Sequence, residues 1–284
     1  MKILITGING QVGHALMREL TEHDLIGLTR QDCDLTNLDQ IRQVIDQHQP
    51  DLMINPAAYT KVDQAEDEPE LAYQINRDAP RVMAEKALEY DIPIIHFSTD
   101  FVFDGQKEGH YTEEDLPYPL GIYGQAKLAG EEAIKEVNCM YFIFRTSWVY
   151  SSMGRNFYLN IQRRIGEQDD LKVVNDQSGV PTSSLFIAQQ IKKMIPKLLN
   201  ENKGIYHLVP NGACTWFDFA KFILSIAYPN YKHKIDAINS DEFLTRARRP
   251  SNSYLLNQKV RDTFMLELDD WRSVFLNFLK QING

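Results

Sequence analysis

The sequence lacks any long hydrophobic run, and this absence bears on its partners. No stretch approaches the roughly 18 consecutive apolar residues of a membrane-spanning helix, and the apolar start at Lys2–Ile5 is far too short for a secretory signal peptide. Positive charge is also scarce, since 30 Lys and Arg residues face 39 Asp and Glu residues, for a net charge of −9. An acidic chain is a poor general binder of nucleic acid. We therefore expect neither a membrane nor a nucleic-acid partner.

Cysteine is rare as well. Cys33, Cys139 and Cys214 form an odd, widely spaced set, which has neither the pairing of a disulfide framework nor the spacing of a zinc site. This pattern indicates reduced cysteines and a cytoplasmic protein. The chain also lacks an H-E-x-x-H motif and a G-x-S-x-G motif, which argues against metalloproteases and serine hydrolases.

A glycine-rich turn lies near the N-terminus, between an apolar strand over residues 1–6 and a helical pattern with Val12, Leu16 and Leu20 on one face. Such a turn lets the backbone approach a pyrophosphate, whose charge the helix N-terminus stabilises. A tight strand–helix turn packed by small residues is the alternative. The candidate dinucleotide-binding residues here are Gly7, Asn9, Gly10, Gln11, Val12 and Gly13.

The end of the second predicted strand, over residues 25–29, bears on the choice between NAD and NADP. An acidic residue there would bond the adenosine ribose and reject a 2′-phosphate, but this chain has a threonine followed by Arg30. The sequence therefore favours NADP and leaves NAD as an alternative, because Arg30 also suits a solvated loop and Asp32 or Asp34 could take the ribose. Asp34 and Leu35 are expected on the adenine side.

Strands and helices alternate along the first half of the chain. A helix through residue 47 begins with a capping-box pattern at Thr36, and further strands are expected over 52–55, 93–97 and 141–145, with helices over 80–90 and 123–137. This order predicts an α/β fold with a Rossmann-type doubly wound parallel sheet. We expect residues 1–150 to form the NADP-binding domain, completed by segments near 172–200 and 204–209. Residues 151–284 are expected to form mainly a smaller, discontinuous α/β substrate-binding lobe.

Small and polar residues follow the third and fourth predicted strands. Ala57, Ala58 and Tyr59 would permit close backbone contact with a cofactor, although a plain turn also uses such residues. Ser98 and Thr99 lie at the carboxyl end of the fourth strand, where their hydroxyls could hold an oxygen that is being reduced.

Tyr123 and Lys127 are four residues apart at the start of a predicted helix, so their side chains share one face. A lysine ammonium beside a phenol favours the phenolate and lowers the tyrosine pKa. The pair therefore predicts a tyrosine that acts as an acid or base. Lysine also follows tyrosine at this spacing in many ordinary helices, so the prediction depends on the motifs that precede it.

Four other features also bear on the site. The polar stretch over 104–119 suits a mobile loop above a ligand site. The acidic run over 63–70 suits a solvated face at the start of a helix better than a metal site. Trp148, at the end of a strand, suits either the core or a ligand-stacking surface. The basic cluster over 246–250 is either an exposed loop or an anchor for a substrate phosphate, which arginine binds bidentately.

Together these motifs resemble the extended short-chain dehydrogenase/reductase family, in the order and spacing of Gly7-x-x-Gly10-x-x-Gly13, Ser98-Thr99-Asp100 and Tyr123-x-x-x-Lys127. Further motifs are similar to the branch formed by the dTDP-4-dehydrorhamnose reductases and extend through nearly the whole chain. They are residues 55–63, 98–105 and 145–150, the Asp176-Gln177-x-Gly179-x-Pro181-Thr182 segment and the Arg249-Pro250-x-x-Ser253 segment.

The resemblance implies a role for each matching residue. It makes Tyr123 the proton donor, Lys127 the residue that holds the nicotinamide ribose and assists Tyr123, and Thr99 the residue that bonds the substrate carbonyl. It places Asp100 and Trp148 on a nucleotide-sugar, with Val62 nearby, and so favours a ligand-facing Trp148. With Ser98 and Arg249, these residues complete the candidate substrate site. The implied reaction is the NADPH-dependent reduction of the 4-keto group of dTDP-4-dehydro-β-L-rhamnose.

One departure concerns metal and assembly. Some members of this family dimerise through magnesium bound by glutamates, but the matching positions here are Ala15 and Leu185. We therefore expect no magnesium and a monomer or weak dimer. Two alternative functions stay open: a non-catalytic regulatory subunit of the methionine adenosyltransferase type, and a reductase of another nucleotide-linked deoxysugar.

Overall fold

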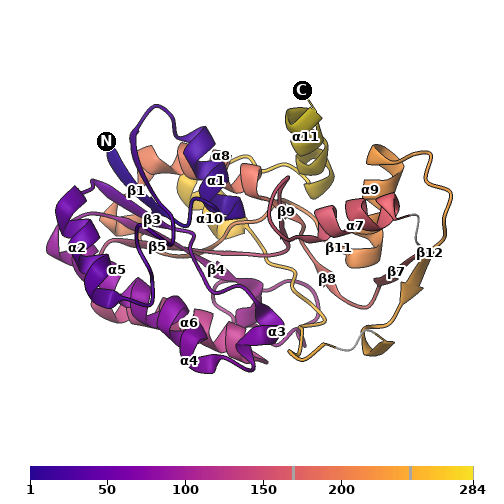
Figure 1. The fold of residues 1–284 in the computed structure, drawn as a ribbon, viewed down its shortest axis with the longest axis horizontal. Coiled ribbons are helices and arrows are strands. Elements are labelled where there is room, and N and C mark those ends of the chain that lie inside the picture. Colours follow the sequence, from indigo (N-terminus) through magenta and orange to yellow (C-terminus); the bar gives the residue numbers. More distant parts are fainter. Residues whose placement is uncertain (168–169, 243–244, 284) are drawn as a thin grey trace.

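The computed structural model describes residues 1–167, 170–242 and 245–283. Its centre is a parallel six-stranded sheet in the order β10-β5-β4-β3-β1-β2 (Figure 1). The chain order reverses between β1 and β3, and ligands of open α/β sheets bind at such a switch point, beyond the carboxyl ends of the strands. The strands are β1 (Lys2–Thr6), β2 (Asp24–Leu28), β3 (Leu52–Asn55), β4 (Ile94–Thr99), β5 (Tyr141–Thr146) and β10 (Gly204–His207).

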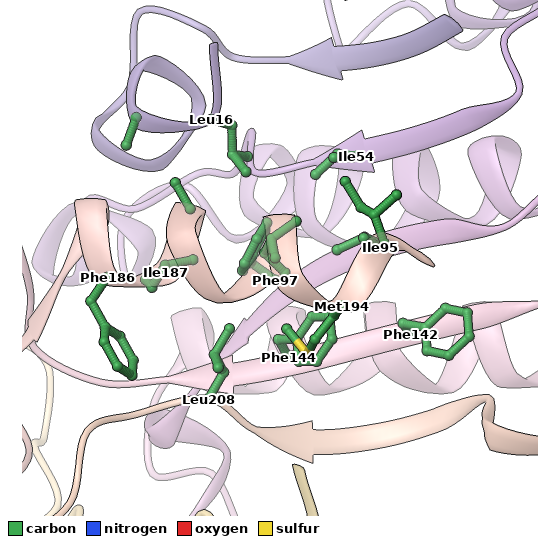
Figure 2. Close-up of a cluster of buried hydrophobic side chains, with 14 of the residues drawn as sticks. Leu16, Ile54, Ile95, Phe97, Phe142, Phe144, Phe186, Ile187, Met194 and Leu208 are labelled. Carbon is green, nitrogen blue, oxygen red and sulfur yellow. The ribbon is translucent and has the colours of Figure 1, made fainter. Parts of the chain in front are cut away.

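Helices cover both faces of this sheet because successive strand residues point to opposite sides. In β1, Ile3 and Ile5 join one apolar cluster, and Leu4 between them joins the other. The first cluster, part of which Figure 2 shows, packs α1 (Gln11–Glu19), α8 (Ser184–Met194) and α10 (Gln258–Phe264) onto the sheet. The second packs α2 (Leu38–His48), α5 (Ala79–Glu89) and α6 (Ile122–Val137) onto the other face.

Much of the chain beyond β5, apart from α8, β10 and α10, builds a lobe around an aromatic core that includes Tyr150, Phe219, Trp271 and Phe275. Burial of such large rings supplies most of the apolar area in a small core. Its elements are α7 (Phe157–Gly166), α9 (Trp216–Ala227) and α11 (Trp271–Asn283), with the strand pairs β6 (Val149–Tyr150) and β9 (Thr182–Ser183), β7 (Leu171–Val174) and β12 (Ile235–Ile238), and β8 (Ser178–Gly179) and β11 (Cys214–Thr215).

Short helical segments complete the fold. They are α3 (Val62–Ala65), α4 (Pro69–Tyr73), η1 (Gln74–Asp78), η2 (Asp100–Val102), η3 (Ile195–Lys197), η4 (Asn200–Asn202) and η5 (Ser240–Glu242). In the described part of the chain, no helix combines the length and the apolar character that crossing a membrane requires.

The predicted doubly wound parallel sheet is confirmed. The capping box was misplaced by one residue, since Asn37 rather than Thr36 caps α2 by accepting from the Gln40 amide. Neither β12 nor α10 was predicted. The division into two domains stays a prediction, although β10 and α8 do lie with the main sheet, whereas β7 pairs with β12 in the lobe.

Candidate active site

The glycine-rich turn is shaped by close backbone contacts. Gly7 has a φ of +60°, and a Cβ built there would lie 2.9 Å from the Cβ of Ala57, just beyond β3. At Gly13, a Cβ would lie 2.3 Å from the carbonyl oxygen of Gly7. Gly10 is the N-cap of α1 and offers no side-chain acceptor, so no side chain caps the first-turn amides. The turn thus fits a dinucleotide pyrophosphate at the switch point of the sheet.

Gln11 connects this turn to the lobe. Its Oε1 atom accepts hydrogen bonds from Ser151 Oγ and from Asn156 Nδ2, both at 2.9 Å. Asn156 also caps α7 by accepting from the Leu159 amide. The segment that would hold the cofactor is therefore tied to the first helix of the lobe.

At the adenosine end, Arg30 follows β2 with its side chain 78% exposed and its Nε atom 3.7 Å from Asp34 Oδ2. Asp32 turns back on the strand end, where it accepts from the amide and the hydroxyl of Thr29 at 2.9 and 2.6 Å. These two bonds lower the pKa of Asp32. Asp32 is thus engaged locally, and Arg30 is the accessible charge beside this end of the site.

Thr99 and Tyr123 meet at the carboxyl end of β4. Thr99 caps η2, accepting from the Phe101 amide at 3.1 Å, and Tyr123 opens α6 with its ring edge-on to Phe101. Burial raises the pKa of Tyr123 to about 12, with a smaller upward effect of Asp100, while its hydrogen bond with Thr99 lowers it. Tyr123 is therefore a protonated phenol at neutral pH.

Lys127 lies one turn further along α6 and is buried. Its Nζ atom donates to the carbonyl oxygen of Phe97 at 2.6 Å and lies 3.2 Å from His96 Nε2. Burial lowers its pKa to about 8, and Glu131 acts in the opposite direction. The prediction that Lys127 lowers the pKa of Tyr123 is wrong for this structure, because the ammonium is directed to β4 and burial dominates at the phenol.

Asp100 is buried beside this pair. Its Oδ1 atom accepts from Thr99 Oγ1 at 3.0 Å, and burial raises its pKa to about 6. Ser98, one residue before Thr99, is buried as well, and its hydroxyl has no hydrogen-bond partner among the described residues. Ser98 Oγ and Asp100 Oδ2 thus both keep hydrogen-bonding capacity at the end of β4.

A cleft of 1540 Å³ is lined mostly by the lobe, together with residues that follow β3 and β4, and Thr99, Tyr123 and Lys127 are not among its lining residues. Its wall carries Asp63 and Asp104 from the first half of the chain, and Trp216 from the lobe. The cations in its lining are Arg164, Lys172, Arg246, Arg248 and Arg249. A concave site with this many cations suits an anionic ligand of nucleotide-sugar size.

Trp148 lies at the end of β5 in a strained backbone, with a φ of +47°. Its ring stacks on Trp216 with centroids 3.5 Å apart and planes 9° apart, and Gly179 leaves the space that its edge fills. Trp216 lines the cleft, whereas Trp148 packs behind it in the aromatic core. Sequence reasoning missed Trp216, because nothing local distinguishes it from a core residue of α9.

The basic cluster over 246–250 and the acidic run over 63–70 meet at this cleft. Arg249 Nη2 lies 3.2 Å from Asp63 Oδ2, which belongs to α3, and Arg246 pairs with Asp67. Asp63 also accepts from the Ala247 amide. The acidic run lies at the surface, as expected, and two of its carboxylates are in addition ion-pair partners of the arginine loop.

The other predicted residues differ in their contacts and in their burial. Leu35 is buried in the core cluster that includes α2. The Tyr59 hydroxyl donates to Glu68 at 2.7 Å, and Val62 opens α3. Asn9 is exposed in the turn, and Val12 and Ala58 are half-buried.

The positions expected to lack magnesium ligands also have a defined place. Ala15 is buried on α1, and Leu185 is half-buried on α8, which packs against α1. Among the described residues, no group of three or more His, Cys, Asp or Glu side chains is arranged to hold a metal ion.

The whole chain matches one family model, the RmlD substrate binding domain, over residues 1–283. A dTDP-4-dehydrorhamnose reductase of Sinorhizobium fredii is 38% identical over 278 residues, covering 95% of this chain and 94% of the relative. The enzyme of that name from Escherichia coli is also 38% identical, over 283 residues, 96% of this chain and 95% of its own.

Solved structures agree. The dTDP-4-dehydrorhamnose reductase of Bacillus anthracis, in complex with NADP, superposes with a TM-score of 0.93 at 37% identity, with 99% of each chain covered. Its counterpart from Clostridium acetobutylicum gives a TM-score of 0.94 at 35% identity over the full length of both chains.

Proposed function

Because the chain belongs to the RmlD substrate-binding-domain family, whose close relatives are dTDP-4-dehydrorhamnose reductases, we propose that it reduces the 4-keto group of dTDP-4-dehydro-β-L-rhamnose to give dTDP-L-rhamnose. The cofactor is NADPH, as the relative crystallised with NADP indicates, and the turn at Gly7–Gly13 has the shape to hold it. The carrying observation is the convergence of Thr99, Tyr123 and Lys127 at the carboxyl end of β4.

NADPH, when bound, supplies the hydride that is added to C4 of the sugar. Tyr123 then protonates the O4 atom, for which its raised pKa provides the correct, protonated form. Thr99 hydrogen-bonds both this phenol and the oxygen that develops charge. Lys127, which is charged below its pKa of about 8, would hold the nicotinamide ribose of the bound cofactor.

The cleft accommodates the nucleotide part of the substrate. Its diphosphate matches the guanidinium groups of the arginine loop, and Arg249 exchanges Asp63 for a phosphate oxygen. The base or sugar lies against the Trp148–Trp216 pair, at the face that Trp216 presents to the cleft. Asp100 has an unused oxygen for a sugar hydroxyl.

We further propose that the protein acts in the cytoplasm as a monomer or weak dimer. Its three cysteines are buried, unpaired thiols, which persist in a reducing compartment. Ala15 and Leu185 offer no oxygen ligand for a bridging metal.

The test is turnover by the purified protein. NADPH and dTDP-4-dehydro-β-L-rhamnose should give NADP⁺ and dTDP-L-rhamnose, with the product identified by mass spectrometry against an authentic standard. Other keto-sugar nucleotides, tested in parallel, decide between this substrate and another deoxysugar. Absence of turnover with every sugar, together with binding to a methionine adenosyltransferase, would instead support the regulatory alternative.

A further inference from the structure

A buried histidine lies directly behind Lys127. His96 is in the middle of β4 and only 1% exposed. Its Nε2 atom is 3.2 Å from Lys127 Nζ, and its Nδ1 atom is 3.1 Å from the side-chain amide of Asn55 on β3. No motif of the chain indicates a role for His96, because a histidine inside an apolar strand is predicted to be an ordinary core residue.

The contacts continue across the sheet. Thr6 Oγ1 donates to the side-chain oxygen of Asn55 at 2.6 Å, and the Asn55 Nδ2 atom faces His96. Thr6 is the last residue of β1, next to the glycine-rich turn. The contacts therefore run through three neighbouring strands, from Thr6 to Asn55 to His96, and reach Lys127 on α6. All four side chains are buried, so each depends on the next for its hydrogen bonds.

We propose that His96 is a positioning residue for Lys127, accepting a hydrogen bond from its ammonium and holding it in the active site in the charged form. This inference rests on the function proposed above. An ammonium has three N–H donors. The Phe97 carbonyl and His96 Nε2 take two of them in fixed directions, which leaves one for the cofactor or the phenol.

The role fixes the tautomer of His96. An accepting Nε2 places the ring proton on Nδ1, which then needs an acceptor. The role therefore requires the Asn55 amide to be turned over from the orientation described above, with its oxygen toward His96 Nδ1 and its NH₂ group toward Thr6 Oγ1. The two ends of an amide have nearly the same shape, so both orientations fit the same contacts.

The surrounding charges support a neutral acceptor. Burial, aided by the positive charge of Lys127, holds the pKa of His96 well below its usual range. The charge that favours the ammonium is Glu131, one turn along α6, whose carboxylate is fixed by two bonds of 2.9 and 2.6 Å from Arg145 of β5. Asp100 of η2 acts on Tyr123 instead. Without His96, only Glu131 and the Phe97 carbonyl counter the lowering of the Lys127 pKa by burial. The pKa of Lys127 is then expected to fall further.

A matched pair of variants tests this role. In His96→Gln, the amide of the new side chain reaches the position of the histidine Nε2 atom and keeps a hydrogen-bond partner for Lys127. In His96→Asn, the shorter side chain reaches only the position of the histidine Nδ1 atom and keeps a partner for Asn55 instead. We expect His96→Asn to lower kcat about tenfold, as for loss of one hydrogen bond to a charged group, and to move the alkaline limb of the kcat profile down by about one pH unit. His96→Gln should retain both near the wild-type values.

Equal behaviour of the two variants, whether both active or both impaired with an unmoved limb, would overturn the proposal. A wild-type protein without turnover would instead contradict the proposed function.

A second measurement needs neither turnover nor a His96 variant. In protein labelled with ¹⁵N-histidine, two rings should stay neutral from about pH 5 to 8, where ordinary histidines titrate, because burial lowers the pKa of both His96 and His207. The ring of His96 is the one that should carry its proton on Nδ1 and respond to a change at Lys127. Its Nε2 signal should move in Lys127→Met. If no ring carries its proton on Nδ1, or if the Nε2 signal of His96 is the same in Lys127→Met as in the wild type, the hydrogen bond itself is refuted.

Discussion

Tyr123→Phe is the most direct test of the proposed chemistry, because it removes one oxygen and little else. The Phe ring retains the edge-on contact with Phe101, whose centroid lies 5.6 Å away. What is lost is a buried hydroxyl and its hydrogen bond with Thr99. One such bond contributes about 0.5–1.5 kcal/mol to folding, so the melting temperature should fall by only a few degrees, at about 2–4 °C per kcal/mol in a large domain.

The effect on turnover should be far larger. Removing a general acid typically costs about 10²–10⁴-fold in rate, and no neighbouring hydroxyl replaces a donor on this ring. Cofactor affinity should change by less than about threefold, equivalent to under 1 kcal/mol, since Lys127 is held by Phe97 and His96 rather than by Tyr123.

The assay follows the loss of NADPH absorbance at saturating sugar nucleotide, with NADPH affinity from fluorescence titration. Tyr118→Phe is the matched control, because Tyr118 is 70% exposed and should tolerate the same change without effect. A Tyr123→Phe enzyme with kcat within a few-fold of the wild type would refute the assignment of Tyr123 as proton donor.

Four further predictions concern cofactor, substrate, pH and metal. NADPH should be preferred to NADH, and Arg30→Ala should raise the KM for NADPH alone; a wild-type KM for NADPH tenfold above that for NADH would contradict this choice. Trp148→Ala should weaken substrate binding, because its stack with Trp216, which contributes about 0.5–1.5 kcal/mol beyond burial, holds Trp216 at the cleft; unchanged affinity in a titration would place the ligand elsewhere. Because Lys127 is charged only below its pKa of about 8, kcat should decline as pH rises through that value, and a profile flat to pH 10 would argue against a charged lysine. EDTA should alter neither activity nor apparent mass, since Ala15 and Leu185 supply no oxygen ligand; activity lost to EDTA and restored by Mg²⁺ would reveal other ligands.

The sequence was informative where function depends on local spacing. The glycines of the turn and the Tyr123–Lys127 spacing are properties of one strand end or one helix, and periodicity is enough to find them. The parallel sheet followed from the alternation of elements for the same reason.

What could not be predicted depends on contacts between distant segments. Arg249 and Asp63 are 186 residues apart in the chain, and no local pattern links an acidic run to a basic loop. His96 is embedded in an apolar strand, where its pattern is that of core. The sign of the Tyr123 pKa shift was missed because spacing shows that Lys127 is near, but not that its ammonium is directed to Phe97.

The ion pairs of the arginine loop have a consequence for how the cleft discriminates between anions. Arg246 and Arg249 are already neutralised by Asp67 and Asp63, so a diphosphate enters by exchanging one anion for another rather than by adding charge to a bare cationic site. A single phosphate or chloride ion gains little binding free energy from that exchange. A ligand that also contacts Trp216 gains binding free energy from a second part of the cleft. At Arg246 and Arg249, the resident carboxylates thus raise the affinity that a small anion needs before it can displace them.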